Sequence, residues 1–144
     1  MNEVDTMLAE HAIAKLVMQY ALHNDAREFG ALAEMFVEQG KFTRPAGGDP
    51  IVGRQNIRES YEARPARVSR HLVANIVVDL LSDTDARCRS TMMIFASPAG
   101  ELPVHAASPA QIGGYDDVLR RENGTWLFVE RRGHLDIEVN LAAA

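Results

Sequence analysis

The segment RHLVANIVVDLL, residues 70–81, is the longest apolar run in the chain and decides how its second half is interpreted. Its aliphatic and β-branched residues predict a long strand, whose side chains point alternately to two faces. One face would be wholly apolar, with Leu72, Ala74, Ile76, Val78 and Leu80, and the other would carry His71, Val73, Asn75 and Val77. A histidine and an asparagine among valines indicate that the second face is either solvated or lines a cavity.

The composition predicts a soluble globular protein. The chain has 144 residues, 47% hydrophobic and 24% charged, which suits one domain over residues 1–144. Its formal net charge of −5 argues against nucleic acid or an anionic membrane as a partner. Cys88 is the only cysteine, so no intrachain disulfide can form. No stretch approaches the ~20 apolar residues of a membrane span and no signal peptide is visible, so we expect a cytoplasmic protein.

Before residue 69 the pattern is helical. Apolar residues recur from Ile13 with a period of 3.6 residues and give way to Tyr20, Asn24 and Asp25, which predicts a first helix with a polar end. A second helix is predicted over 27–39, with Gly40 as its end. A short third helix is predicted over 53–64, before a proline.

After residue 69 the pattern changes to strands, and Asn123-Gly124 predicts a type I′ hairpin between the last two. The loop over 98–109 could be a lid or a plain connection. Helices followed by antiparallel strands predict an α+β fold with the helices packed on one sheet face. Because the other face also carries apolar residues, we expect a second subunit to cover it, which predicts a homo-oligomer, either a dimer or a trimer.

No motif for a metal or a nucleotide is present, and we expect neither a metal nor a cofactor. Five arginines lie within residues 54–70, with glutamates between them. Ion pairs on a solvated surface are the simplest interpretation of this pattern. The alternative is that the arginines bind an anionic substrate group or cofactor tail. His71 could act as a base if a carboxylate fixed its tautomer. Asp25 is the candidate carboxylate because it stands where the inward stripe of the first helix turns polar, although a structural histidine is the plainer interpretation.

Several loose motifs resemble, in their order, the SnoaL-like family of the nuclear transport factor 2-like superfamily. They are YALHND, AEMFVEQGKF, VGRQNI, RHLVAN and GYDDVLRRENGTWLFVERR, which together run from about Ile13 to Asp136. The chain is most similar to the branch of scytalone dehydratase, hexachlorocyclohexane dehydrochlorinase and bile-acid dehydratase. The resemblance implies a cone-shaped α+β half-barrel, with N-terminal helices packed on a curved, mostly antiparallel sheet.

The same resemblance implies an acid–base site. It pairs Asp25 with His71, lets Tyr20 polarise a substrate oxygen, and matches an arginine after the last tryptophan to Arg131, with Arg132 as the other register. Asn75 would point into the cavity beside His71. Apart from the resemblance, we interpret Val73 as lining the pocket with His71 and Asn75. Further walls could come from Phe36, Tyr61, Met93, Phe95, Tyr115, Leu119 and Val129, for each of which a plain core role is the alternative. Two features of scytalone dehydratase have no match here: a second active-site histidine on the next strand and a tyrosine on the short strand after the second helix.

The leading hypothesis is a cofactor-independent lyase or isomerase that acts on a small, largely apolar, cyclic substrate. His71 would remove a proton from carbon, while Tyr20 and Arg131 would stabilise the developing oxyanion or the departing water or halide. Dehydration, dehydrohalogenation and double-bond migration share this step. The alternatives are a non-catalytic module or subunit that binds a small hydrophobic molecule in the same pocket, and a polyketide cyclase.

Overall fold

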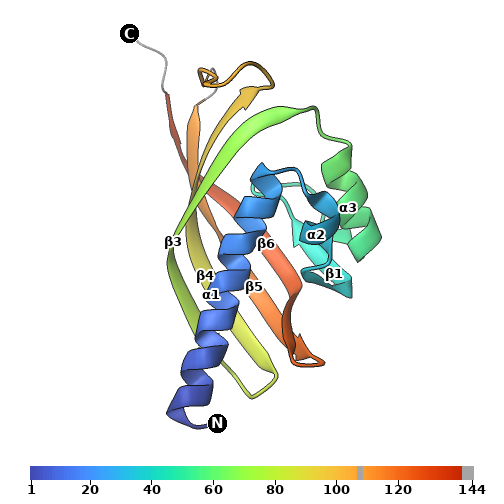
Figure 1. Cartoon of the computed structure of the whole chain (residues 1–144), viewed down its shortest axis with the longest axis vertical. Helices are drawn as coiled ribbons and strands as arrows, with labels where there is room; N and C mark the ends of the chain where they lie inside the picture. The colour runs from blue at the N-terminus through green and yellow to red at the C-terminus, as the bar shows by residue number, and fades with distance from the viewer. Residues whose placement is uncertain (107–108, 141–144) are drawn as a thin grey trace.

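In the computed structural model, which describes residues 1–106 and 109–140, a long helix crosses one face of a curved six-stranded sheet (Figure 1). The helices are α1 (Glu3–Asp25), α2 (Phe29–Ala33) and α3 (Arg54–Glu62). The strands are β1 (Phe36–Thr43), β2 (Ile51–Val52), β3 (Arg67–Leu80), β4 (Asp85–Pro98), β5 (Ala110–Glu122) and β6 (Thr125–Val139).

The sheet order is β2-β1-β6-β5-β4-β3, so β3 is an edge strand. Every neighbouring pair is antiparallel except β1 and β6. The two short helices lie beside β1, at the far side of the sheet from β3 (Figure 1). The predicted α+β fold, with helices on a curved and mostly antiparallel sheet, is confirmed.

The β5–β6 hairpin turns at Asn123 and Gly124, as predicted, with φ angles of 50° and 82°. The loop over 98–109 is joined to β4 by the hydroxyl of Ser97, which donates to the carbonyl of His105 at 3.3 Å. Residues 107–108 of this loop lie outside the described residues. Within residues 1–106 and 109–140, no helix is long and apolar enough to cross a membrane.

The predicted second helix over 27–39 is wrong in its extent. α2 ends at Ala33, and β1 begins three residues later. The backbone N–H of Phe128 on β6 donates to the carbonyl of Met35 at 2.8 Å, where the parallel β1–β6 pairing begins. The apolar residues that suggested a longer helix are all buried, namely Phe29, Leu32, Met35 and Phe36. Their spacing therefore suited a helix although the chain changes to a strand between them.

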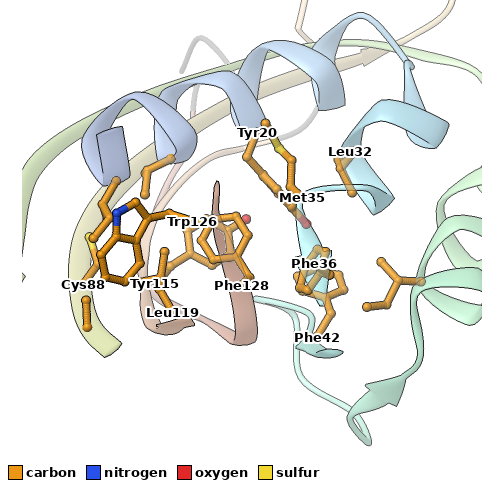
Figure 2. Close-up of a cluster of buried hydrophobic side chains, with 14 of the residues drawn as sticks. Tyr20, Leu32, Met35, Phe36, Phe42, Cys88, Tyr115, Leu119, Trp126 and Phe128 are labelled. Carbon is orange, nitrogen blue, oxygen red and sulfur yellow. The ribbon is translucent and has the colours of Figure 1, made fainter. Parts of the chain in front are cut away.

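Aromatic rings fill the space between α1 and the sheet (Figure 2). Tyr20 meets Phe36, Tyr115 and Phe128 edge to face, with ring centroids 6.1, 6.3 and 5.8 Å apart. Such pairs contribute about 0.5–1.5 kcal/mol each beyond the burial of their surface. Phe36 and Leu119 have no exposed surface. Both are core residues, which corrects the prediction that they line a cavity.

A β-bulge at Asn75 changes which residues of β3 face the helices. The β3–β4 register shifts between residues 74 and 77, and Asn75 has a φ of 50°, a left-handed conformation that asparagine tolerates better than β-branched residues do. Ile76 and Val78 consequently pack on the core on the same side as Val73. Asn75 is exposed. The predicted faces are therefore wrong beyond residue 74, and Asn75 does not reach the cavity.

An apolar row crosses four strands on the outer face of the sheet. Its members are successive cross-strand neighbours: Leu72, Met93, Ile112 and Ile137. Leu72 is 60% exposed. Inward positions of β4 alternate with these and include Ile94, so Met93 and Phe95 point outward, contrary to the prediction that they line the cavity. The homo-oligomer stays a prediction, and this row is the surface that a second subunit would cover.

Candidate active site

α1 ends in a Schellman motif that fixes the position of Asp25. The N–H of Arg27 donates to the carbonyl of Asn24 at 3.1 Å, and the N–H of Glu28 donates to the carbonyl of His23 at 2.9 Å. Arg27 has a φ of 58°, the left-handed conformation that glycine usually supplies at this position. Asp25 is therefore the last residue of α1, where the helix dipole disfavours a negative charge. Its carboxylate needs stabilising contacts from outside the helix.

β3 supplies three such contacts. Asp25 Oδ1 accepts a hydrogen bond from the Ser69 hydroxyl at 2.8 Å and lies 2.5 Å from His71 Nδ1, while Oδ2 accepts the backbone N–H of His71 at 2.8 Å. Because β3 is an edge strand, this backbone N–H is free to point at α1 rather than at another strand. The side chains of His71 and Asp25 are 5% and 10% exposed. The two residues that the sequence paired are thus in contact.

The contacts set the charge of Asp25 and the tautomer of His71. Burial acts to raise the pKa of Asp25, but the hydrogen bonds from the ring and backbone of His71, together with that from Ser69, lower it below its usual value. The ionised carboxylate therefore accepts the proton on Nδ1. In the neutral ring this leaves Nε2 as the proton acceptor.

His71 is one wall of a cavity of about 240 Å³ beside the end of α1. Tyr61, Ile94, Tyr115 and Leu135 supply its aromatic and apolar walls. Pro45 and Ala46 also line it, and the polar part of the wall comes from Asn24, Arg44, Arg64, Arg67 and Gln111. The cavity is smaller than the sites that hold drug-sized ligands, so it suits a small molecule. The predicted apolar pocket is wrong in its polarity, because arginines form much of its wall.

Asn24 lies against the nitrogen of His71 that Asp25 leaves free. Its amide Nδ2 is 3.5 Å from His71 Nε2, at the outer limit of a hydrogen bond, and the residue is 5% exposed. The sequence placed Asn24 on the inward stripe of the first helix but assigned it no role in the site. A substrate atom that approaches Nε2 must displace this amide or share the space with it.

Tyr61, rather than Tyr20, lines the cavity. The two hydroxyl oxygens are 2.5 Å apart, and either one could be the donor. Burial raises the pKa of both phenols, so each keeps a proton at neutral pH. Tyr20 is 2% exposed. This corrects the prediction that Tyr20 contacts a substrate oxygen, because it reaches the cavity only through the hydroxyl of Tyr61.

Arg131 is buried in the core and does not line the cavity. Its Nε lies 3.1 Å from Asp117 Oδ1, with side chains that are 1% and 0% exposed. The guanidinium carbon lies 4.2 and 3.8 Å from the ring centroids of Tyr20 and Tyr115. Burial raises the pKa of Asp117 to about 6, although the charge of Arg131 opposes this. The prediction that Arg131 contacts a leaving group is therefore wrong, and its charge can act on a ligand only across the tyrosine rings.

A second bulge decides between Arg131 and Arg132. Trp126 and Phe128 are buried, and simple alternation along β6 would next turn residues 130 and 132 inward. The β5–β6 register instead shifts by one residue at Val129. Arg131 is consequently buried and Arg132 is exposed. Val129 is the extra residue of the bulge and does not line the cavity, contrary to the prediction.

The cavity thus gathers only some of the predicted residues. His71 with its partner Asp25, Tyr61 and Tyr115 come together, whereas Val73 packs on the core instead. Ser69 could have been found from the sequence, since it stands two residues before His71 on one strand and shares its face.

The position of Arg44 depends on a contact that the sequence does not reveal. Gly133 of β6 has no Cβ, and one built there would lie 2.6 Å from Pro45 Cγ. The missing side chain lets the segment after β1 approach β6 and bring Arg44 to the cavity.

Other reactive groups are sparse in the described part of the chain, where no three His, Cys, Asp or Glu side chains gather as a metal site would require. Cys88 is buried, and burial raises the pKa of its thiol to about 12, so the thiol stays protonated at neutral pH.

Comparison with known proteins agrees with the fold. The family model described as SnoaL-like domain matches residues 5–132. The chain belongs to the SnoaL-like family. No curated protein matches this SnoaL-like chain at a significant level.

Solved structures resemble this SnoaL-like protein over nearly its whole length. A candidate scytalone dehydratase from Novosphingobium aromaticivorans is 22% identical, with a TM-score of 0.83, and 99% of this chain and 94% of that one are covered. A type 2 hexachlorocyclohexane dehydrochlorinase is 15% identical, with a TM-score of 0.82 and coverages of 99% and 95%. A protein of unknown function from Mycobacterium tuberculosis is 27% identical, with a TM-score of 0.76 and coverages of 94% and 77%. At these identities the likeness to the first two concerns the fold alone.

Proposed function

We propose that this SnoaL-like protein is a cofactor-independent lyase or isomerase in which His71 removes a proton from a carbon atom of a small substrate. The hydrogen-bonded series from Asp25 through His71 to the cavity carries the proposal. Asp25 keeps the proton on Nδ1 and stabilises the imidazolium once Nε2 has accepted a second proton. A base held in this way contributes about 10²–10⁴-fold to the rate. Two structural neighbours named as a dehydratase and a dehydrochlorinase are consistent with this chemistry.

The electron pair of the broken C–H bond has two possible fates. In an elimination it forms a double bond as water or a halide leaves the neighbouring carbon. In an isomerisation it moves along a conjugated system, which takes the proton back from His71 at another carbon. Tyr61 lines the same cavity and can donate its hydroxyl proton to a developing oxyanion or leaving group when Tyr20 donates to the Tyr61 oxygen.

Scytalone and a hexachlorocyclohexane are suitable first probes, since the two neighbours are named for them. Loss of water is followed by absorbance, and release of hydrogen chloride by a chloride assay. We expect His71→Ala and Asp25→Asn each to lower turnover of an accepted probe by about 10²–10⁴-fold. The matched controls are His134→Ala and Asp136→Asn, which remove an exposed pair with Nδ1 2.9 Å from Oδ1. An equal loss of turnover in the control variants would show that His71 has no specific catalytic role.

A non-catalytic binding module is the second candidate. Two observations support it. The Asn24 amide lies against His71 Nε2, and Tyr20 and Arg131 are buried in the core and do not line the cavity. It predicts that neither probe is turned over or exchanges hydrogen with deuterated water. It also predicts that His71→Ala leaves ligand affinity nearly unchanged. A polyketide cyclase would use the same acid–base pair, and its cyclised product would distinguish it.

A further inference from the structure

Three arginines line the cavity without a carboxylate partner. Arg44 follows β1, Arg64 follows α3, and Arg67 begins β3, so three separate segments bring positive charge to one place. None of the three forms an ion pair within the described residues. The whole chain carries a formal charge of −5, so this local surplus is opposite in sign to the balance of the molecule. Asp25 is the nearby carboxylate, and it is already bonded to Ser69 and His71.

Each guanidinium has donors to spare. Arg44 Nη2 donates to the carbonyl of Ser60 at 2.9 Å, but its Nε is buried with no partner among the described residues. Arg64 lies 4.3 Å from the ring centroid of Tyr61, which holds its guanidinium against the cavity wall. The side chain of Arg67 has no hydrogen-bond partner among the described residues, and burial, followed by repulsion from Arg64, lowers its pKa. A bound anion would relieve both costs.

Two neighbouring arginines, by contrast, do have carboxylate partners. Arg58 lies 2.7 Å from Glu62 on α3, and Arg54 lies 3.4 Å from Glu34. The expectation of local ion pairs therefore holds for these two. It does not hold for Arg64 and Arg67, which point to the alternative that the sequence left open.

We propose that the substrate of this cavity carries an oxyanion group, a carboxylate or a phosphate, which Arg64 and Arg67 bind while the rest of the molecule lies between Tyr61 and His71. This inference rests on the proposed function and names its substrate class. The planar guanidinium group can donate two parallel hydrogen bonds to such a group, which fixes orientation as well as position. A neutral substrate would leave these partly buried cations, and the buried Nε of Arg44, without a counter-charge.

Binding of small ring compounds without turnover tests this inference. The probes are benzoate, phenyl phosphate and the neutral benzamide, titrated into the whole protein and followed by calorimetry and amide NMR shifts. We expect benzoate or phenyl phosphate to bind at least about ten-fold more tightly than benzamide. Added salt should lower the affinity for either anion. Arg64→Gln and Arg67→Gln should each lower the affinity for the anion by about ten- to hundred-fold and leave the affinity for benzamide unchanged. Arg58→Gln, which removes a paired arginine outside the cavity, is the matched control and should leave anion binding unchanged.

Asp25→Asn supplies an independent readout because it removes a negative charge that acts on Arg67. It should strengthen binding of the anion while leaving benzamide unchanged. Equal affinities for benzoate and benzamide, no binding of either anion at millimolar concentration, or equal effects of Arg67→Gln and Arg58→Gln would overturn the inference. Anion binding that Arg67→Gln weakens, in a protein that neither turns over scytalone or a hexachlorocyclohexane nor exchanges their hydrogen with deuterated water, supports the inference and favours the binding module over the lyase. If a neutral probe is turned over at a rate that Arg67→Gln does not change, the lyase is supported and the anionic substrate is ruled out.

Discussion

Replacing Asp25 by asparagine removes one of the two acceptor oxygens that join the end of α1 to β3. Oδ1 accepts from Ser69 and the His71 ring, and Oδ2 accepts from the His71 backbone. An amide can keep the first two bonds only by turning its NH₂ group toward the backbone N–H of His71. That N–H then lacks a partner, which costs about 1–3 kcal/mol. Removing a negative charge from the C-terminus of α1 returns about 0.3–1 kcal/mol. We therefore expect Asp25→Asn to lower the free energy of unfolding by about 1–2 kcal/mol at pH 7.

The effect should depend on pH in a definite direction. The folded-state pKa of Asp25 is lowered from 3.8, so its contribution is complete above about pH 4 and is lost as the pH falls through the lower, folded-state value. Urea unfolding of wild type and Asp25→Asn between pH 3 and pH 7 measures this. Asp79→Asn, the same substitution at an exposed position of β3, is the control and should change stability by less than about 0.5 kcal/mol. A loss no larger than that of the control, or one that persists unchanged to pH 3, would refute the three-bond arrangement.

Three further predictions concern the core, the bulge of β3 and the cavity. Arg131→Met should cost about 3–5 kcal/mol at pH 7 because it leaves Asp117 buried without a counter-charge. The loss should shrink as the pH falls towards about 6 and level off below it, where Asp117 carries a proton in both proteins. Adding Asp117→Leu should restore most of the stability, which urea unfolding measures. Asn75→Val should cost about 1–2 kcal/mol and Asn75→Gly very little, since only the former resists the left-handed conformation, and equal melting temperatures would contradict this. Tyr61→Phe should lower turnover of an accepted probe more than Tyr20→Phe does, because only Tyr61 lines the cavity, and the reverse order in kcat would place the donor elsewhere.

The sequence predicted the large elements well because their signals are local. The periodic stripe of α1 and the Asn123-Gly124 turn depend on residues close together in the chain, and both are confirmed. The resemblance paired Asp25 with His71, and the structure brings them into contact. The order of helices and strands likewise led to the α+β fold.

The residues misplaced along β3 and β6 share a physical cause, a bulge in each strand. One extra residue at Asn75 or Val129 reverses the alternation of every side chain beyond it, and neither position carries a marker as plain as glycine. Asn75 and Val129 were misplaced for this reason. Arg131 does face inward, but it lies against Asp117 and the tyrosine rings instead of the cavity. The extent of α2 failed differently, because burial on both sides of the change from helix to strand preserved a helical spacing.

The arginines of the cavity needed the tertiary structure. Arg58 and Arg67 look alike in the sequence, and only the fold shows that one meets a glutamate and the other a cavity wall.

The most direct test of the account is the state of the two ring nitrogens of His71, read from their ¹⁵N chemical shifts in selectively labelled protein. His71→Ala assigns the signals. At a pH where the ring is neutral, the account predicts that Nδ1 carries the proton in wild type, held by Asp25, and that Nε2 is the unprotonated nitrogen facing the substrate. In Asp25→Asn the proton should redistribute toward Nε2. A proton on Nε2 in wild type, or signals that ignore the substitution, would show that Asp25 does not orient His71 and would contradict its role as the base.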